Sequence, residues 1–140
     1  MAAPETLHAT AVSCQGRAAL IIGPSGSGKS ALALELMARG AGLIADDRVI
    51  VTLQDGAVIA SAPAAIAGRI EARFVGLLRA EAAAPAPVAL IVDMGQGESE
   101  RLPPQRSKKV MGITLPLVHN IDKPYFPAAI LQYLKAGRRD

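Results

Sequence analysis

The chain has 140 residues, of which 51% are hydrophobic, 3% aromatic and 19% charged, with a formal net charge of +3. This length and apolar share suffice for one domain with one core, built from small and branched side chains rather than aromatic ones. The basic residues are scattered, which disfavours a nucleic-acid-binding protein, and no apolar run approaches the roughly 20 residues of a membrane helix. The single cysteine, Cys14, cannot form an internal disulfide. We therefore expect a soluble cytoplasmic protein with no membrane or nucleic-acid partner.

Two short strands and a helix are predicted in the first third of the chain. The strands cover Thr10–Val12 and Ala18–Ile22, and a tight turn at Gln15–Gly16 joins them. The second strand runs directly into a glycine-rich segment. A helix over Ser30–Arg39 follows, because leucines are spaced there among alanines, and Gly40 is a plausible terminator.

The middle of the chain predicts short strands and one hairpin. Leu43–Ala45 is a short apolar segment. Arg48–Leu53 and Ala57–Ala60 flank an Asp-Gly pair, which is typical of a tight hairpin turn. We expect a loop over Pro63–Arg69, whereas Ile70–Leu78 is ambiguous between strand and loop.

The last part of the chain predicts two more strands and a closing helix. Ala80–Pro87 is a connector rich in alanine and proline, and Val88–Val92 is a continuous apolar run typical of a buried strand. Gly95–Ser107 is polar and expected to be exposed. Ile113–Val118 is a strand interrupted by a proline, and Ala128–Lys135 is a short helix. Strands alternating with few helices indicate an α/β fold whose sheet includes antiparallel pairs.

The glycine-rich segment carries the clearest chemical signal. It reads Gly23-Pro24-Ser25-Gly26-Ser27-Gly28-Lys29-Ser30 and matches the complete Walker A pattern, G-x-x-x-x-G-K-[ST]. In that pattern backbone N–H groups wrap a phosphate, the lysine reaches the β- and γ-phosphates of a nucleotide, and the serine hydroxyl is placed to bind Mg²⁺. Because a predicted strand precedes the loop and a helix follows it, we expect a nucleotide-binding P-loop.

A P-loop enzyme also needs a carboxylate near the metal ion, usually at the end of an apolar strand. Asp93 follows the longer apolar run, Val88–Val92. Asp46 and Asp47 follow the shorter Leu43–Ala45. The pattern alone therefore favours Asp93.

Three segments in order resemble the catalytic domain of the bacterial HPr kinase/phosphorylase family. The first is His8 with the P-loop, and the second is Arg39-Gly40 followed by Leu43-Ile44-Ala45-Asp46-Asp47-Arg48-Val49. The third is Ile70-Glu71-Ala72-Arg73-Phe74-Val75-Gly76-Leu77-Leu78, which is similar to the family's Leu-Glu-Ile-Arg-Gly-Leu-Gly-Ile-Ile signature. The resemblance spans about residues 8–78. It implies an α/β fold with a mixed central sheet, in which residues 1–140 form a single P-loop kinase domain of the HPr kinase / phosphoenolpyruvate carboxykinase type.

The resemblance also implies an activity and reverses the choice of carboxylate. It implies an ATP- and Mg²⁺-dependent kinase that phosphorylates a serine of HPr, or of a related phosphocarrier protein of the sugar phosphotransferase system, and a homo-oligomer, since the family forms hexamers. Asp46 matches the general base that takes the serine proton, and Asp93 is then a strand-end acid without a role. The implied catalytic residues are His8, Asp46, Asp47 and Arg73, and the implied metal ligands are Ser30, Asp47 and Glu71.

The chain departs from the family pattern at three places. Ala31 follows the P-loop serine where the family has an acid, and only seven residues precede His8, which predicts a shortened form with the catalytic domain alone. The family's basic Arg-Pro-Gly-Arg loop corresponds to Asn120–Phe126, in which Lys123 is the only cation. Phosphate-driven dephosphorylation is therefore doubtful.

Other interpretations of the same residues stay open. The chain could be a small-molecule P-loop kinase, or a regulatory module that binds ATP without transferring a phosphoryl group. The Asp46–Asp47 pair favours chemistry, whereas Ala31 and the missing arginines favour the ATP-sensing module. The structural alternatives are that Asp46–Asp47 is a plain turn before a strand, that Glu71 and Arg73 form an exposed ion pair on a strand, and that His8 is a surface residue.

Overall fold

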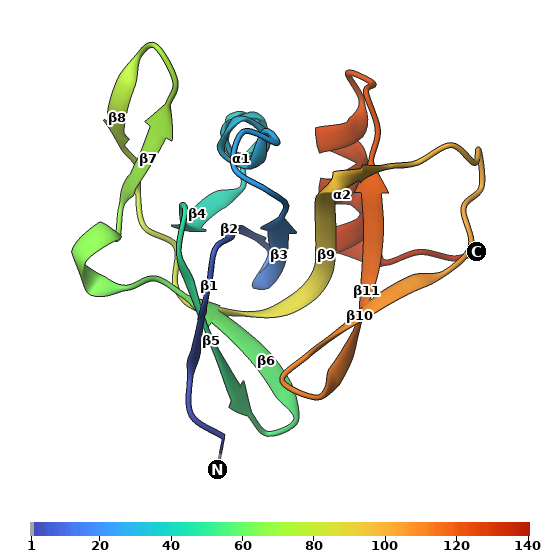
Figure 1. Ribbon diagram of the computed structural model, residues 1–140, viewed down its shortest axis with the longest axis horizontal. Coiled ribbons are helices and arrows are strands. Elements are labelled where there is room, and N and C mark those ends of the chain that lie inside the picture. Colours follow the sequence, from blue (N-terminus) through green and yellow to red (C-terminus); the bar gives the residue numbers. More distant parts are fainter. Residues whose placement is uncertain (1) are drawn as a thin grey trace.

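A curled mixed sheet of nine strands forms the centre of the structure, a computed structural model that describes residues 2–140 (Figure 1). Seven strands follow one another across the sheet in the order β1 (Glu5–Leu7), β5 (Val49–Gln54), β6 (Ala57–Ser61), β9 (Ala86–Gly97), β3 (Arg17–Ile22), β2 (Thr10–Cys14) and β4 (Gly42–Ala45). The remaining two, β10 (Arg106–Val110) and β11 (Ile113–Asn120), extend the sheet from β9. A separate hairpin consists of β7 (Arg69–Ala72) and β8 (Gly76–Arg79), and it follows a 3-10 turn over Ala64–Ile66.

Strand β9 connects the two parts of the sheet. Its first residues pair antiparallel with β6, and the rest of the strand pairs parallel with β3 on one side and β11 on the other. The curved path of β9 between these neighbours is visible in Figure 1. Because the carboxyl ends of β3, β9 and β11 lie at the same edge, the loops that follow these strands gather there.

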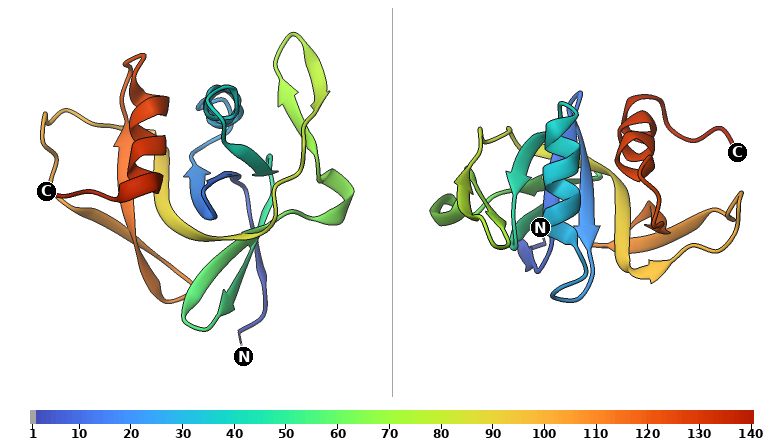
Figure 2. Two further views of the ribbon diagram at one scale, coloured as in Figure 1. Left: turned by 180° about the vertical axis from the view of Figure 1, so that it is seen from behind. Right: turned by 90° about the horizontal axis from the view of Figure 1, so that it is seen from above.

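The core lies on both faces of the central strands. Residues alternate between two apolar clusters, so Leu20 and Ile91 face one cluster while Ile21 and Leu90 face the other. This two-sided burial explains why β3 and β9 read as continuous apolar runs rather than as alternating ones. The second cluster includes residues of both helices, α1 (Lys29–Ala38) and α2 (Phe126–Ala136). The two helices contact each other and lie side by side on this face of the sheet (Figure 2).

Three hairpins turn on a two-residue loop with a glycine in second place. The pairs are Gln15–Gly16, Asp55–Gly56 and Met111–Gly112, and both residues of each pair have positive φ. This conformation belongs to the type I′ turn, whose twist matches that of the flanking strands. The first two turns confirm the hairpins predicted from the sequence.

The structure corrects the predicted elements in several places. Strands β1 and β10 were not expected, and the ambiguous Ile70–Leu78 segment is the β7–β8 hairpin. The polar segment Gly95–Ser107 contains the end of β9 and the start of β10. Pro116 does not interrupt β11, because pairing with β9 begins only at Leu117 and the proline is therefore not needed as a donor on that side.

The helices in the described part of the chain are short. Helix α1 has 10 residues and α2 has 11. None of the helices within residues 2–140 is both long and apolar enough to span a membrane.

Candidate functional site

The P-loop joins the end of β3 to the first turn of α1. Gly23, Gly26 and Gly28 have φ values of 146°, 81° and 96°, a region that side chains rarely adopt. A Cβ on Gly23 would lie 2.6 Å from Oγ of Ser27 and 3.2 Å from the backbone nitrogen of Gly95. The loop therefore follows a path that depends on its glycines, with its backbone open toward the N-terminus of α1.

Two polar side chains of the loop fit a bound phosphate. Lys29 is only 7% exposed, and its Nζ donates to the carbonyl oxygens of Gly23 at 2.8 Å and Pro24 at 3.1 Å. Oγ of Ser27 is buried and has no hydrogen-bond partner within residues 2–140. Buried polar groups are normally paired, so the Ser27 hydroxyl lacks an expected partner. An anion bound in the loop could accept hydrogen bonds from both the Ser27 hydroxyl and the Lys29 amine. The residues present thus fit a nucleotide phosphate.

Asp46 lies behind the P-loop and fixes its serine. The residue is 7% exposed, and its Oδ1 accepts hydrogen bonds from Oγ of Ser30 at 2.6 Å and from Oγ1 of Thr10 at 3.0 Å. Its Oδ2 accepts a hydrogen bond from the backbone N–H of Glu71 at 3.0 Å. Both carboxylate oxygens are therefore engaged, and Asp46 links the start of α1 to β2 and β7.

Asp47 points the other way, although it is the next residue. Its φ of 72° places it in the left-handed region, which aspartate tolerates better than most residues. The Asp47 side chain is 63% exposed, and Oδ1 lies 3.0 Å from Nε2 of His8. One aspartate is thus a structural anchor, whereas the other forms an accessible pair with a histidine.

A pocket of about 510 Å³ opens beside the P-loop, within the usual size range of ligand sites. Its walls come from the P-loop and α1, from the segment before β2, from the residue after Asp46, and from the β7–β8 hairpin. The lining residues are His8, Thr10, Ser25, Gly26, Gly28, Lys29, Ser30, Ala31, Leu34, Asp47, Glu71, Ala72, Arg73 and Val75.

This pocket brings together most of the residues that the sequence singled out. His8, Asp47, Glu71 and Arg73 share it with the P-loop, although they come from three separate segments. Asp46 is not among the lining residues, because its carboxylate is turned toward Thr10 and Ser30. Glu71 and Arg73 form no ion pair with each other within the described chain.

Asp93 lies within β9 and does not line the pocket. Its Oδ1 accepts a hydrogen bond from the backbone N–H of Gly95, in the same strand, at 2.9 Å. Within residues 2–140, no three His, Cys, Asp or Glu side chains converge closely enough to hold a metal ion by themselves. Mg²⁺ at a phosphate site commonly binds only one or two protein groups together with phosphate oxygens and water, so Ser30 with a nearby carboxylate would suffice.

Sequence reasoning missed Thr10 as a site residue. Thr10 is completely buried in β2 and donates to Asp46, so it holds the carboxylate that holds Ser30. A hydroxyl residue at the start of a largely apolar strand was the available signal, since a buried hydroxyl requires a partner. The sequence also did not indicate that Val75 of the hairpin reaches the pocket.

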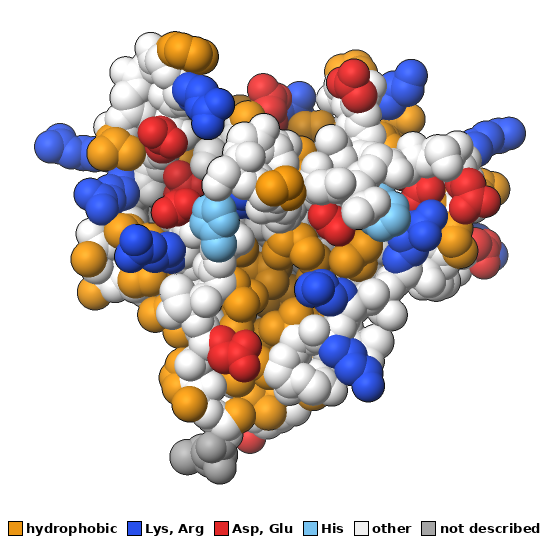
Figure 3. All heavy atoms as spheres, in the orientation of Figure 1, with side chains coloured by type: hydrophobic (Ala, Val, Ile, Leu, Met, Phe, Trp, Pro, Cys, Tyr) orange, Lys and Arg blue, Asp and Glu red, His pale blue; other side chains and the backbone are white. Residues whose placement is uncertain are grey.

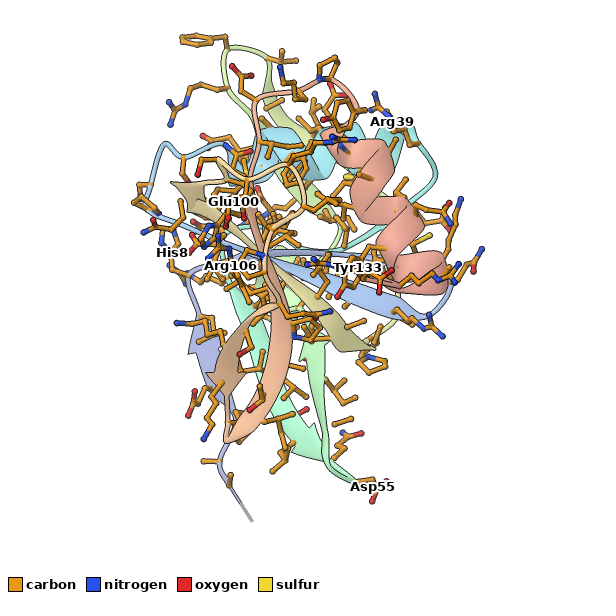
Figure 4. All side chains as sticks on the ribbon, turned by 90° about the vertical axis from the view of Figure 1, so that its right-hand side faces the viewer. His8, Arg39, Asp55, Glu100, Arg106 and Tyr133 are labelled. Carbon is orange, nitrogen blue, oxygen red and sulfur yellow. The ribbon has the colours of Figure 1, made fainter. Side chains whose placement is uncertain are left out.

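A second polar cluster lies just after the carboxyl end of β9. Arg106 makes a two-pronged contact with Glu98, at 3.0 Å to each carboxylate oxygen, and lies 3.7 Å from Glu100, which is labelled beside it in Figure 4. The hydrogen bonds from Arg106, helped by backbone N–H groups, lower the pKa of Glu98 to about 2, although burial opposes the shift. Glu98 is only 7% exposed, so Arg106 is committed to a structural ion pair.

The family comparison concerns mainly the first part of the chain. The model of the HPr Serine kinase C-terminal domain matches residues 1–84. The HPr kinase/phosphorylase of Clostridium botulinum (strain Eklund 17B / Type B) is 47% identical over 77 residues, which are 54% of this chain and 25% of the relative. That of Levilactobacillus brevis is 42% identical over 79 residues, 56% of this chain and 25% of the relative. The matched part spans about a quarter of the length of these curated relatives.

The structural comparison extends over nearly the whole chain. The HPr(Ser) kinase/phosphatase from Coxiella burnetii superposes with a TM-score of 0.77 at 23% identity, covering 94% of this chain and 88% of that one. The mixed α/β fold is therefore shared beyond residue 84 as well. Since the family model covers residues 1–84 of 140, a stretch that contains the P-loop, both aspartates and the β7–β8 hairpin, this chain belongs to the HPr serine kinase C-terminal domain family.

Proposed function

We propose that this protein is a cytoplasmic, ATP-dependent serine kinase that phosphorylates an HPr-type phosphocarrier protein of the phosphotransferase system. One observation carries the proposal: a single pocket is lined by the P-loop groups Lys29 and Ser30 and by the accessible Asp47–His8 pair. A phosphoryl-transfer site needs a cradle for the donor's phosphates and a base beside it for the acceptor hydroxyl. The relatives named HPr kinase/phosphorylase support the choice of acceptor.

The polar groups in and around the pocket have distinct roles in this proposal. The backbone N–H groups of the P-loop and the charge of Lys29 hold the phosphates of ATP. Ser30 and Glu71 would hold Mg²⁺, and the ion would offset the negative charge of the transferring phosphoryl group. Asp46 keeps the Ser30 hydroxyl oriented through its 2.6 Å contact.

The contacts favour Asp47 rather than Asp46 as the base. The resemblance assigned the base to Asp46, but both oxygens of Asp46 already accept hydrogen bonds and the residue does not line the pocket. Asp47 lines the pocket with an exposed carboxylate. We therefore propose that Asp47 accepts the proton of the acceptor serine. The serine oxygen attacks the γ-phosphorus of ATP, and ADP leaves. His8, 3.0 Å from Oδ1 of Asp47, orients that carboxylate, and Arg73 at the rim faces the phosphate charge.

A direct transfer assay tests the proposal. The purified protein is incubated with Mg-ATP and HPr-type carriers, and the carriers are examined by mass spectrometry for one added phosphate on a serine. We expect the mass of one phosphate on one serine of the cognate carrier. Phosphorylation of a metabolite pool instead would support a small-molecule kinase, and tight Mg-ATP binding without any transfer would support an ATP-sensing module.

We expect the reverse reaction, removal of the phosphate by inorganic phosphate, to be much slower than the forward one. Two anions held about 5 Å apart repel by about 3 kcal/mol at an effective dielectric constant of about 20, and forked arginine side chains offset this best. The segment Asn120–Phe126 offers only the exposed Lys123, and Arg106 is held by Glu98. Pyrophosphate release from phosphorylated carrier in millimolar phosphate measures the rate. Release as fast as the forward transfer would contradict the expectation.

A further inference from the structure

The tip of the β7–β8 hairpin exposes large apolar side chains. Phe74 is completely exposed, Val75 is 74% exposed and Leu77 is 68% exposed. The hairpin projects beside α1 at the upper left of Figure 1, and Figure 3 shows hydrophobic and basic side chains together on this part of the surface. Adjacent exposed apolar side chains next to a functional pocket are typical of an interaction site.

Phe74 does not stabilise the isolated fold. Its φ of 70° lies in the left-handed region, which is unfavourable for a bulky residue. An exposed ring buries no surface that would offset this cost. A locally unfavourable conformation that brings no packing suggests that the side chain acts in a contact made with another molecule.

The hairpin carries basic residues at its base and near its apolar tip. Arg69 and Arg79 are directly opposite each other in the strand register, where like charges destabilise the pair. Arg73 adds a third positive charge near the tip, against the single acid Glu71. Within residues 2–140 none of the three arginines takes part in an ion pair. A surface of this kind fits a partner protein that presents both an apolar side chain and acidic side chains.

The hairpin tip is continuous with the pocket. Val75 and Arg73 line the pocket that also contains Asp47, whereas Phe74 lies on the outer, solvent side of the tip. A metabolite bound in the pocket does not need the exposed Phe74 ring, whereas a folded protein that presents a serine to Asp47 can cover it. The exposed apolar tip beside the pocket therefore favours a protein acceptor over a small one.

From these observations we infer that the β7–β8 hairpin is the docking element for the phosphoacceptor protein. Phe74 and Leu77 cover an apolar side chain of the acceptor protein, and Arg69 and Arg79 at the base of the hairpin pair with its acidic side chains. The inference rests on the proposed kinase function, but binding tests it independently of transfer.

The test compares Phe74→Gly with the control Leu102→Ser. Glycine keeps the left-handed backbone while removing the ring, and Leu102 is an equally isolated apolar residue, 81% exposed, in the loop between β9 and β10 on the opposite side of the molecule (Figure 1). Fluorescence anisotropy measures the binding of a labelled HPr-type phosphocarrier in the presence of a non-hydrolysable ATP analogue. We expect Phe74→Gly to weaken carrier binding at least tenfold and Leu102→Ser to leave it unchanged. The affinity for the ATP analogue and the melting temperature should not fall in either variant.

A salt series tests the contribution of the arginines separately. Carrier binding by the unmodified protein should weaken between 50 and 500 mM salt, about as expected from screening of exposed charges, and Arg69→Gln/Arg79→Gln should reduce that dependence. Equal carrier affinity in Phe74→Gly and the unmodified protein would overturn the inference, as would a carrier that does not bind at all. A change from oligomer to monomer in Phe74→Gly, measured by light scattering, would overturn it in favour of a second copy of this chain. If Phe74→Gly loses carrier binding but the unmodified protein never transfers phosphate, the docking element is upheld and the kinase proposal is refuted.

Discussion

Replacing Lys29 with alanine is expected to weaken Mg-ATP binding by about 100-fold or more and to abolish phosphoryl transfer. Nζ of Lys29 contacts only the carbonyl oxygens of Gly23 and Pro24, so its charge is available to the β- and γ-phosphates of the nucleotide. Two charge-assisted hydrogen bonds contribute about 3 kcal/mol or more, which corresponds to about 100-fold in affinity. Isothermal titration calorimetry with Mg-ATP measures the loss.

The fold should survive this change. Lys29 belongs to neither apolar cluster, so the core stays intact. The carbonyl oxygens of Gly23 and Pro24 lose a donor, and we therefore expect the melting temperature to fall by only a few degrees. Lys109→Ala is the matched control, because Lys109 is an exposed lysine on β10 and does not line the pocket. An Lys29→Ala variant that binds and turns over Mg-ATP normally would refute the assignment of the P-loop.

The sequence predicted best those features that depend on contiguous residues. The P-loop is one unbroken motif between a strand and a helix, and two of the hairpins are marked by an X-Gly pair. In each case the local backbone conformation follows from the residues themselves. The third such turn, Met111–Gly112, carried the same signal for β10 and β11, but its flanking strand was not recognised.

Strand β10 was missed because its sequence does not look like a strand with a buried face. It reads Arg-Ser-Lys-Lys-Val, and only Val110 is buried. It lies at the edge of the sheet and pairs with β11 alone, a place where charged side chains are common because they discourage pairing with other chains. The segment Ile70–Leu78 was ambiguous for a related reason: its turn contains Phe74, a residue type that rarely adopts positive φ.

The division of roles between Asp46 and Asp47 could not be read from the sequence. Two adjacent carboxylates have the same chemistry, and only the backbone conformation decides where each one points. Asp46 directly follows β4 and faces Thr10 and Ser30, whereas the positive φ of Asp47 turns the next side chain toward His8. His8 and Thr10 come from the N-terminal segment, so the partners that distinguish the two aspartates are nearly forty residues away in sequence.

Asp47→Asn is expected to lower the rate of phosphoryl transfer by about 10²- to 10⁴-fold, the usual contribution of a positioned acid or base. Its affinity for Mg-ATP and its melting temperature should change little, because the side chain is exposed and contacts only His8. Initial rates at saturating Mg-ATP measure the effect. Asp93→Asn is the control and should be nearly silent, since the Asp93 side chain accepts a hydrogen bond from Gly95 of its own strand and does not line the pocket.

Asp46→Asn should behave differently, and the contrast between the two variants decides which aspartate is the base. An amide in place of the Asp46 carboxylate loses an acceptor for Ser30 and Thr10 or for the Glu71 backbone, so the free energy of unfolding should fall by about 2 kcal/mol and Mg-ATP should bind more weakly. Its transfer rate at saturating Mg-ATP should fall less than that of Asp47→Asn. If Asp46→Asn instead loses transfer while keeping full stability and full nucleotide affinity, and Asp47→Asn remains active, then Asp46 takes the proton and the buried hydrogen bonds around it must open during the reaction.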